Sequence, residues 1–494
     1  MSSPYDLGRR LTFAYVALIA GAVTIFALIH WLGARLGTPA PPVLKGAATA
    51  QAVPLMNTLV SMAMVLATAT AVGCVVSRLG QPRVIGELLA GVLLGPSFFG
   101  GIMPHLATYL LPATVMPYIA MLAQLGVVLY MFQVGLQLDV ELIRGRAHSA
   151  AFMSHASIIV PLVFGAALAL FLYPRFSTND VSFLAFGMFV GVAMAVAAFP
   201  VLARILNERG LSRTHIGAMA LTCAAVDDVT AWLLLAVVVG LVRHANTADA
   251  VATLASTVLF IAVSFTLVRP LLRGLAGRVE ARATPRAVLA SALAGLLISA
   301  AATEWIGIHA VFGAFIFGAV IPRDSSLARS ATQRLEGLTV LLLPAYFAFT
   351  GMRTEVGLVS GWMDWALCGV IICTATAGKL GGTFTAARLA GMERSSALRL
   401  GILLNTRGLM ELVVLNIALE LHVISPELFT MMVIMAVVTT MMTTPVLQWL
   451  DSRDASVNKM KCQPMPDACD LRRHEDSVPP ATLVDVTSRN SLAR

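Results

Sequence analysis

Long, uninterrupted apolar segments are the feature that most constrains how this chain can fold. We count fourteen of them, most close to the ~20 residues with which a helix crosses ~30 Å of hydrocarbon. Their apolar residues run continuously instead of alternating, and in lipid the backbone groups must be paired within the protein. The sequence therefore predicts an all-α, polytopic membrane protein. The segments lie at 11–33, 54–77, 84–100, 115–137, 150–173, 182–206, 214–243, 249–271, 285–303, 307–322, 335–351, 363–387, 397–420 and 427–449.

The composition supports this class of protein. Hydrophobic residues make up 58% and charged residues 12% of the chain, whereas soluble proteins carry about 25% charged residues. The first segment follows Arg9 and Arg10 as a signal peptide would, but it exceeds the hydrophobic region of about 7–15 residues found in such peptides. We expect a retained helix there. The short third, tenth and eleventh segments are expected to be either re-entrant or strongly packed.

The distribution of lysine and arginine predicts the orientation of the chain. Outside the C-terminal tail, one set of alternate loops carries twenty of these residues and the other set carries five. Because positively charged loops are retained in the cytoplasm, both termini are predicted to be cytoplasmic. Most of the net charge of +8 then reflects topology, and no nucleic-acid partner is needed to explain it.

The polar tail at 451–494 is predicted to be a flexible cytoplasmic segment. Its 44 residues are too few for a nucleotide-binding regulatory domain, and no Gly-rich phosphate motif occurs elsewhere. His155, His215 and His309 are isolated, and neither metal-ligand spacing nor a nucleophile motif is found. We therefore predict neither an enzyme nor a cofactor.

Two adjacent acids lie deep inside the seventh segment. Asp227 and Asp228 follow its start by about fourteen residues, or ~20 Å along a helix. Charges at that depth are costly and are functional hypotheses by default. Neighbouring helical positions point ~100° apart, so one carboxylate can face another helix while the other faces a cavity. The alternative is a pair of acids that merely balances buried cations.

Lys379 is a candidate partner for these acids. It lies in the twelfth segment beside Gly378, Gly381 and Gly382, and small neighbours allow helices to approach closely. A buried ammonium needs a carboxylate partner, because without one it would lose its proton. We expect Asp227 or Asp228 to be that partner, unless the lysine reaches the cytoplasmic interface about eight residues away.

Two segments contain features that interrupt a helix. Pro200 lies in the sixth, and a polar run that includes glycine interrupts the thirteenth at Asn405, Thr406, Arg407 and Gly408. Such breaks are tolerated where the backbone lines a cavity. Arg407 and Glu411 are spaced i,i+4 and are expected to form a structural ion pair, with direct ion contact as the alternative. The broken helices are the middle members of two oppositely oriented triplets, an arrangement typical of secondary transporters.

Six sequence motifs identify a family that the chain resembles. They are QPRVIGELLAGVLLGPS (81–97), FQVGLQLD (132–139), VAAFPVLARIL (196–206), CAAVDDVTAW (223–232), IGIHAVFGAF (306–315) and ILLNTRGLMELVVLN (402–416). In this order they resemble the cation:proton antiporter-2 family of the sodium/proton exchanger superfamily. The similarity covers roughly 54–449 and is greatest to the branch that holds plant and fungal exchangers and many bacterial relatives. It implies a multi-pass protein of a bacterial inner membrane.

The resemblance also implies an architecture. It predicts the sodium/proton antiporter fold with inverted repeats, about thirteen helices and one additional N-terminal helix. A homodimer is implied, in which a six-helix core moves like an elevator against a dimerisation domain. The corresponding boundaries are 1–53 for the additional helix and its linker, 54–138 and 273–352 for dimerisation, 139–272 and 353–450 for the core, and 451–494 for the tail.

The resemblance assigns roles to individual residues. Asp228 matches the carboxylate that binds the cation, Na⁺ or K⁺. Asp227 matches its neighbour, which pairs with a membrane lysine, here Lys379. Glu411 matches an acid that follows the second helix break. Members of the plant-like branch often carry Asn-Asp in place of Asp-Asp, so the substrate of that branch does not transfer directly to this chain.

The expected function is exchange of a monovalent cation for protons across the membrane. Burial disfavours a charged carboxylate, so a cation and a proton would compete for Asp228, and alternating access would carry either across. If Lys379 also releases a proton when the cation binds, two protons move per cation. Two alternatives remain. One is a sodium-coupled symporter of an organic anion, and the other is a membrane sensor or channel subunit without coupled exchange.

Overall fold

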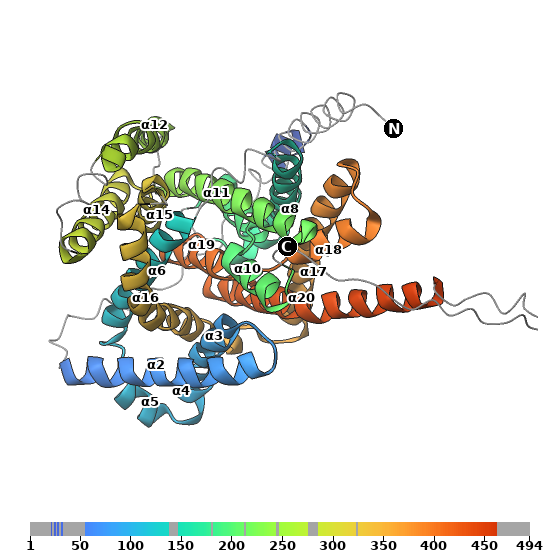
Figure 1. The fold of residues 1–494 in the computed structure, drawn as a ribbon. Coiled ribbons are helices and arrows are strands. Elements are labelled where there is room, and N and C mark those ends of the chain that lie inside the picture. The colour runs from blue at the N-terminus through green and yellow to red at the C-terminus, as the bar shows by residue number, and fades with distance from the viewer. Residues whose placement is uncertain are drawn as a thin grey trace, which may run out of the picture. The chain divides into compact units, whose positions relative to one another are not determined.

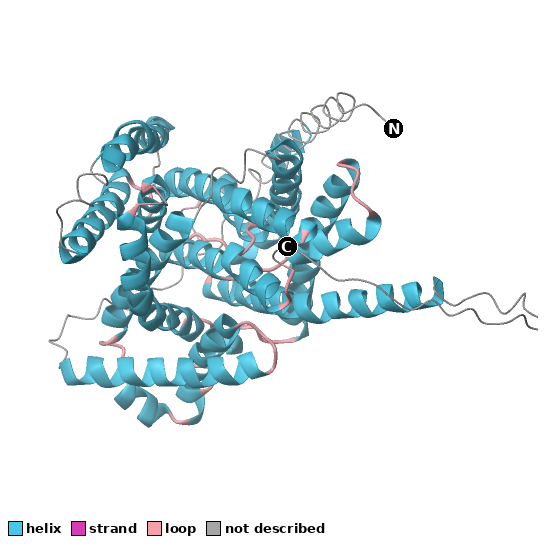
Figure 2. Ribbon diagram, in the orientation of Figure 1, coloured by secondary structure: helices cyan, strands magenta, loops and turns pink. Residues whose placement is uncertain are grey.

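The computed structural model consists of α-helices joined by short connections, and Figure 2 shows this for the described residues. These are residues 21, 24, 25, 27, 28, 31 and 32, and the ranges 55–137, 147–178, 181–211, 214–243, 247–274, 285–322 and 325–461.

The helices are α2 (Leu55–Arg78), α3 (Arg83–Leu94), α4 (Phe99–Ile102), α5 (Pro104–Leu110), α6 (Met116–Gln137), α8 (Ala147–Phe176), α9 (Phe183–Ala195), α10 (Phe199–Glu208), α11 (His215–Arg243), α12 (Thr247–Val263), η1 (Ser264–Val268), α14 (Pro285–Ile306), α15 (Ala310–Val320), α16 (Ser326–Met352), η2 (Val356–Leu358), α17 (Trp362–Leu389), α18 (Arg394–Leu404), α19 (Leu409–Glu420) and α20 (Pro426–Lys461).

The predicted membrane segments match this set of helices. In the described part of the chain, ten helices are long and apolar enough to cross a membrane, and α18 with α19 forms an eleventh span bent by 43°. Two shorter apolar helices, α9 and α15, complete the set. Together they correspond one for one to the second to fourteenth predicted segments. Most of the first segment, 11–33, lies outside the described residues.

Two predicted boundaries differ from the structure. The eleventh segment was expected to be short, at 335–351, but α16 has 27 residues and begins at Ser326. Its first turns carry Arg329, Arg334 and Glu336, which end an apolar segment without ending a helix. Likewise α20 continues to Lys461, so the first residues of the predicted flexible tail are helical.

The helices pack in two groups, which can be followed in Figure 1. In one group α16 packs with α3 and α6, α15 packs with α6 and α14, and α2 joins through α3 and α16. In the other group α8 packs against α9, α11 and α17, and α18 and α19 contact α11 and α9 respectively. Small residues permit these contacts. A Cβ at Gly91 of α3, for example, would lie 2.0 Å from the Ala348 carbonyl oxygen of α16.

The break in the sixth segment lies earlier than its proline suggested. The chain leaves α9 after Ala195, has no regular secondary structure through 196–198, where Val196 is extended, and begins α10 at Phe199. Pro200 is therefore the second residue of α10 rather than part of the break. A proline is tolerated in the first turn of a helix, because the N–H that it lacks would have no helical partner there.

Candidate ion-binding site

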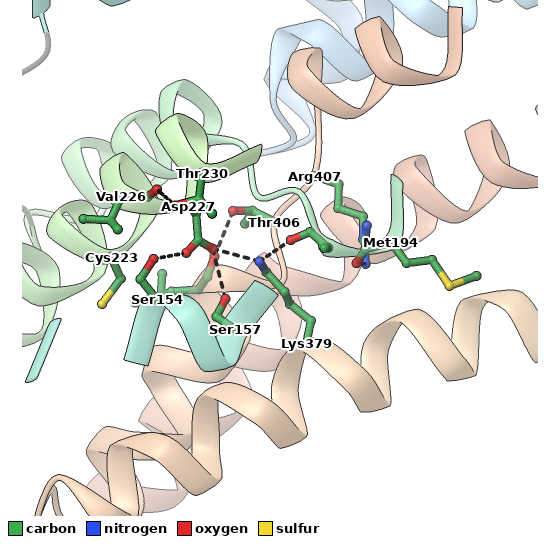
Figure 3. Close-up of polar contacts among 12 residues, drawn as sticks. Ser154, Ser157, Met194, Cys223, Val226, Asp227, Thr230, Lys379, Thr406 and Arg407 are labelled. Carbon is green, nitrogen blue, oxygen red and sulfur yellow. Dashed lines mark hydrogen bonds and ion pairs between the residues drawn. The ribbon is translucent and has the colours of Figure 1, made fainter. Parts of the chain in front are cut away.

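Asp227 lies on α11 and is completely buried. Its Oδ1 accepts a hydrogen bond from the Ser154 hydroxyl at 2.5 Å, and its Oδ2 accepts one from the Ser157 hydroxyl at 3.0 Å. Ser154 and Ser157 are three residues apart on α8, so both hydroxyls project from one face of that helix. Figure 3 shows the carboxylate between them and Lys379.

Lys379 of α17 completes the surroundings of Asp227. Its ammonium lies 2.8 Å from Asp227 Oδ2, and both side chains are buried. Two glycines allow α17 to approach α8 this closely. A Cβ at Gly378 would lie 2.8 Å from Pro161 Cα, and one at Gly382 would lie 2.7 Å from the Ala156 carbonyl oxygen. Asp227 is thus a charge with three donors, which offset the cost of burying it.

Asp228 lies in different surroundings. It is 3% exposed, and neither carboxylate oxygen has a hydrogen-bond partner among the described residues. The backbone amide of Phe199, at the start of α10, approaches the carboxylate without completing a bond of normal geometry. A carboxylate buried without donors is costly unless it binds a cation or a proton. The two adjacent acids are therefore chemically distinct.

The break after α9 leaves three carbonyl oxygens that buried cations satisfy. Arg407 donates from Nη1 to the Ala193 oxygen at 2.9 Å and from Nη2 to the Met194 oxygen at 2.7 Å. Lys379 donates to the next oxygen, that of Ala195, at 2.5 Å. Cations at the C-terminal end of a helix interact favourably with the helix dipole as well. Figure 3 shows Arg407 directed at Met194.

The second break brings its polar residues against the first. The Thr406 carbonyl oxygen accepts a hydrogen bond from the Ala198 amide at 3.0 Å. Gly408 permits the close approach, because a Cβ there would lie 2.9 Å from Val201 Cγ2 and 3.2 Å from Ala198 Cβ. Asn405 ends α18, and its side-chain oxygen is buried without a hydrogen-bond partner in the described structure.

Arg407 and Glu411 are paired less directly than their spacing suggested. Arg407 Nη1 lies 3.5 Å from Glu411 Oε1, whereas its hydrogen bonds go to the carbonyls of α9. The reason is that Arg407 precedes α19, which begins at Leu409, so its side chain is directed across the crossing and not along one helical face. Both oxygens of Glu411 are buried without a hydrogen bond among the described residues.

Three of the polar residues at this site were not identified from the sequence. They are Ser154 and Ser157 on α8 and Thr440 on α20, whose hydroxyl contacts the backbone of Arg407. The i,i+3 spacing of the two serines in an apolar segment was an available signal. Thr440 was not distinguishable, because Thr439, Thr443 and Thr444 surround it in the same segment.

Two broken helices that cross beside a pair of buried carboxylates define a secondary transporter. Comparison with known proteins identifies its kind. The family model described as "Sodium/hydrogen exchanger, transmembrane" matches residues 61–450. The chain belongs to this family.

Individual relatives agree with this assignment. The Na(+)/H(+) antiporter NhaS4 of Synechocystis is 39% identical over 80% of this chain and 97% of its own length. Cation/H(+) antiporter 20 of Arabidopsis thaliana is 36% identical over 78% of this chain, and the K(+)/H(+) antiporter 1 of Saccharomyces cerevisiae is 33% identical over 79% of it. The chain spans about half the length of these two, 47% and 46%.

A solved structure shows the same fold. The sodium proton antiporter MjNhaP1 of Methanocaldococcus jannaschii superposes with a TM-score of 0.59 over 78% of this chain and 94% of its own, at 13% sequence identity. The fold prediction is thereby confirmed. The family also favours cation:proton exchange over an organic-anion symporter or a sensor subunit.

Proposed function

We propose that this protein exchanges a monovalent cation, Na⁺ or K⁺, for protons by alternating access, with Asp228 as the shared site. One observation carries the proposal: Asp228 is a buried carboxylate whose two oxygens have no hydrogen-bond partner in the described structure. A cation or a proton would neutralise it equally well, and both cannot be bound at once. This competition is the minimum requirement for coupled exchange.

Asp227 is proposed to act as the fixed neighbour of this site. It already has Ser154, Ser157 and Lys379 as donors, so it offers little free coordination to a cation. Lys379 is held by Asp227 and by the Ala195 carbonyl. If cation binding at Asp228 weakens the hold of Asp227 on Lys379, the ammonium can release a second proton. Exchange is then electrogenic, with two protons per cation.

The two groups of helices suggest which parts move. We propose the group of α8, α9, α11, α17, α18 and α19 as the predicted core at 139–272 and 353–450, because it carries Asp227, Asp228 and Lys379. The group around α6 and α16 is proposed to form the dimerisation parts predicted at 54–138 and 273–352. We propose that the first group moves against the second, in a homodimer of a bacterial inner membrane with both termini in the cytoplasm.

The identity of the cation is open between two choices. Relatives carry the names of Na⁺/H⁺, K⁺/H⁺ and general cation/H⁺ antiporters. A carboxylate attracts either monovalent cation by its charge. A direct comparison of sodium, potassium and lithium in proteoliposomes, with an internal pH-sensitive dye, would identify the substrate.

The first test is Asp228→Asn. The amide cannot bind a cation by charge or exchange a proton, so cation-dependent proton flux should fall by at least about a hundredfold, equivalent to about 2.7 kcal/mol. Asp364→Asn is the matched control, because Asp364 is also a buried aspartate. It lies in the first turn of α17, at the opposite end from Lys379, and it pairs with Arg175 of α8. Normal flux in a monodisperse Asp228→Asn protein would refute the assignment of the site.

A second measurement tests competition directly. If one carboxylate binds both substrates, the apparent KM for the cation should rise in proportion to proton concentration, while the maximal rate remains constant where the site is saturated. A KM that is independent of pH would contradict a shared site. A reversal potential that gives one-for-one exchange would instead exclude the second proton while leaving the shared site intact.

A further inference from the structure

One hydroxyl group holds the backbone of the second helix break. Thr440 of α20 is 2% exposed, and its Oγ1 accepts a hydrogen bond from the Arg407 amide at 2.9 Å. The same hydroxyl donates to the Arg407 carbonyl oxygen at 2.8 Å. Thr440 therefore satisfies both backbone groups of a residue that lies between two half-helices.

The chemistry of the break explains why a hydroxyl is suited to this position. Arg407 lies outside α18 and α19, so its N–H and C=O lack helical partners, and they are buried where unpaired groups are costly. A threonine hydroxyl is both a donor and an acceptor. It can thus replace the two backbone bonds that a continuous helix would have supplied. No aliphatic side chain of the same shape can do so.

Fixing the backbone of Arg407 also fixes what contacts it. The preceding carbonyl, that of Thr406, accepts from the Ala198 amide of the first break. The side chain of Arg407 binds the Ala193 and Met194 carbonyls near the end of α9. Phe199, directly after Ala198, presents its amide towards Asp228. A series of backbone contacts therefore leads from the Thr440 hydroxyl to Ala198, the residue before Phe199, whose amide faces the proposed ion-binding carboxylate.

We propose that Thr440 is a positioning residue that sets how the two helix breaks cross and thereby determines cation affinity and selectivity. This inference rests on the proposed function, since it concerns the same site. Thr440 does not touch the cation in this proposal. It acts through the Arg407 backbone, and it lines a small cavity of about 20 Å³ together with Arg407 and Gly408.

The same helix supplies matched controls. Thr439 and Thr443 are 0% and 2% exposed, as buried as Thr440. Their hydroxyls donate within α20, from Thr439 to Met435 and Ala436 carbonyls and from Thr443 to the Thr439 carbonyl. Valine at either position removes an equally buried hydroxyl but leaves the helix break untouched.

The experiment compares the variants Thr440→Val, Thr440→Ser, Thr439→Val and Thr443→Val in proteoliposomes. We expect Thr440→Val to raise the apparent KM for the transported cation about tenfold and to change the ratio of sodium to potassium transport. Thr440→Ser, which keeps the hydroxyl, should remain within about twofold of the wild type, as should both control variants.

Two results would overturn the inference. One is a Thr440→Val protein whose KM and ion ratio equal those of Thr439→Val. The other is a Thr440→Ser protein as impaired as Thr440→Val, because the hydroxyl would then be irrelevant. Should the valine variant be unstable in detergent, Thr440→Ser and Thr440→Ala provide the same comparison. Absence of exchange in the wild type would instead refute the proposed function, so the two failures are distinguishable.

Discussion

The two helix breaks are related by the predicted inverted repeat, but the half-helices that lead into them, α9 and α18, satisfy their last carbonyls in opposite ways. After α9, the carbonyls of Ala193, Met194 and Ala195 depend on Arg407 and Lys379, which come from distant segments. After α18, the carbonyls are paired locally. The Asn405 amide bonds to Gly401 and Ile402, and the Thr406 amide bonds to Leu403.

This difference indicates where the protein depends on charge. The end of α18 is closed by its own following residues, so it would form in any context that excludes water. The end of α9 is closed only when two buried cations are in place, and one of them also pairs with Asp227. A change in the charge state of the site can therefore alter the end of α9 directly, whereas the end of α18 is closed by its own backbone hydrogen bonds.

Removing Arg407 is the change with the largest expected effect on this comparison. Arg407→Met would leave the Ala193 and Met194 carbonyls without donors and Glu411 without its nearest cation. We expect a loss of about 3–5 kcal/mol, as for other buried ion pairs that lose one partner. Thermal unfolding in detergent would measure it as a lowered melting temperature.

A double variant separates the two contributions to that loss. Arg407→Met combined with Glu411→Met removes the orphaned acid but still leaves the α9 carbonyls unpaired. We therefore expect only partial recovery of the melting temperature. Complete recovery would show that the carbonyls do not need the arginine, and the contrast between the two breaks would disappear.

Replacing Lys379 should have the next largest effect. Lys379→Gln keeps an N–H donor that can bond to the Ala195 carbonyl, whereas Lys379→Met keeps none. The methionine variant should be less stable by about 1–2 kcal/mol, close to the value of one buried hydrogen bond. In transport, Lys379→Gln should change the pH dependence or electrogenicity more than it changes assembly. Equal stability of the two variants would argue against a role in capping α9.

A change at the locally closed end of α18 should have the smallest effect. The Thr406 hydroxyl donates to the Leu403 carbonyl at 2.8 Å, an oxygen that also accepts from the Thr406 amide. Thr406→Val removes one of two bonds to the same oxygen. We expect a loss of about 0.5–1 kcal/mol in membrane surroundings. A loss as large as that of Arg407→Met would mean that the end of α18 depends on its surroundings as much as the end of α9 does.

Much of the architecture was predictable because the lipid bilayer requires apolar segments to form helices. Thirteen of the fourteen apolar segments could be compared with the described structure, and each corresponds to a helix or a pair of half-helices. Errors arose where a helix continued beyond its apolar part, as in α16 and α20. Hydropathy reports the lipid-facing length of a helix, whereas its hydrogen bonds determine where it ends.

The candidate site was predictable in its charged members and not in its neutral ones. Asp227, Asp228 and Lys379 were identified because a charge in an apolar segment is rare. Ser154, Ser157 and Thr440 were missed, since buried hydroxyls in membrane helices commonly bond to their own backbone, as that of Thr439 does. The exact location of the first break was also missed, because Pro200 marks the start of α10 and not the gap before it.

The sequence by itself therefore determined the class of fold, the buried charges and the existence of two broken helices. Placing a polar group in lipid is so costly that even a single polar residue in an apolar segment is informative. Only the tertiary structure decided how those charges are divided. It gives Asp227 three donors and leaves Asp228 with none among the described residues. It also directs Arg407 to α9 instead of to Glu411 alone. Adjacent and identical residues differ only in the side chains that other helices bring to them, and no local pattern encodes that.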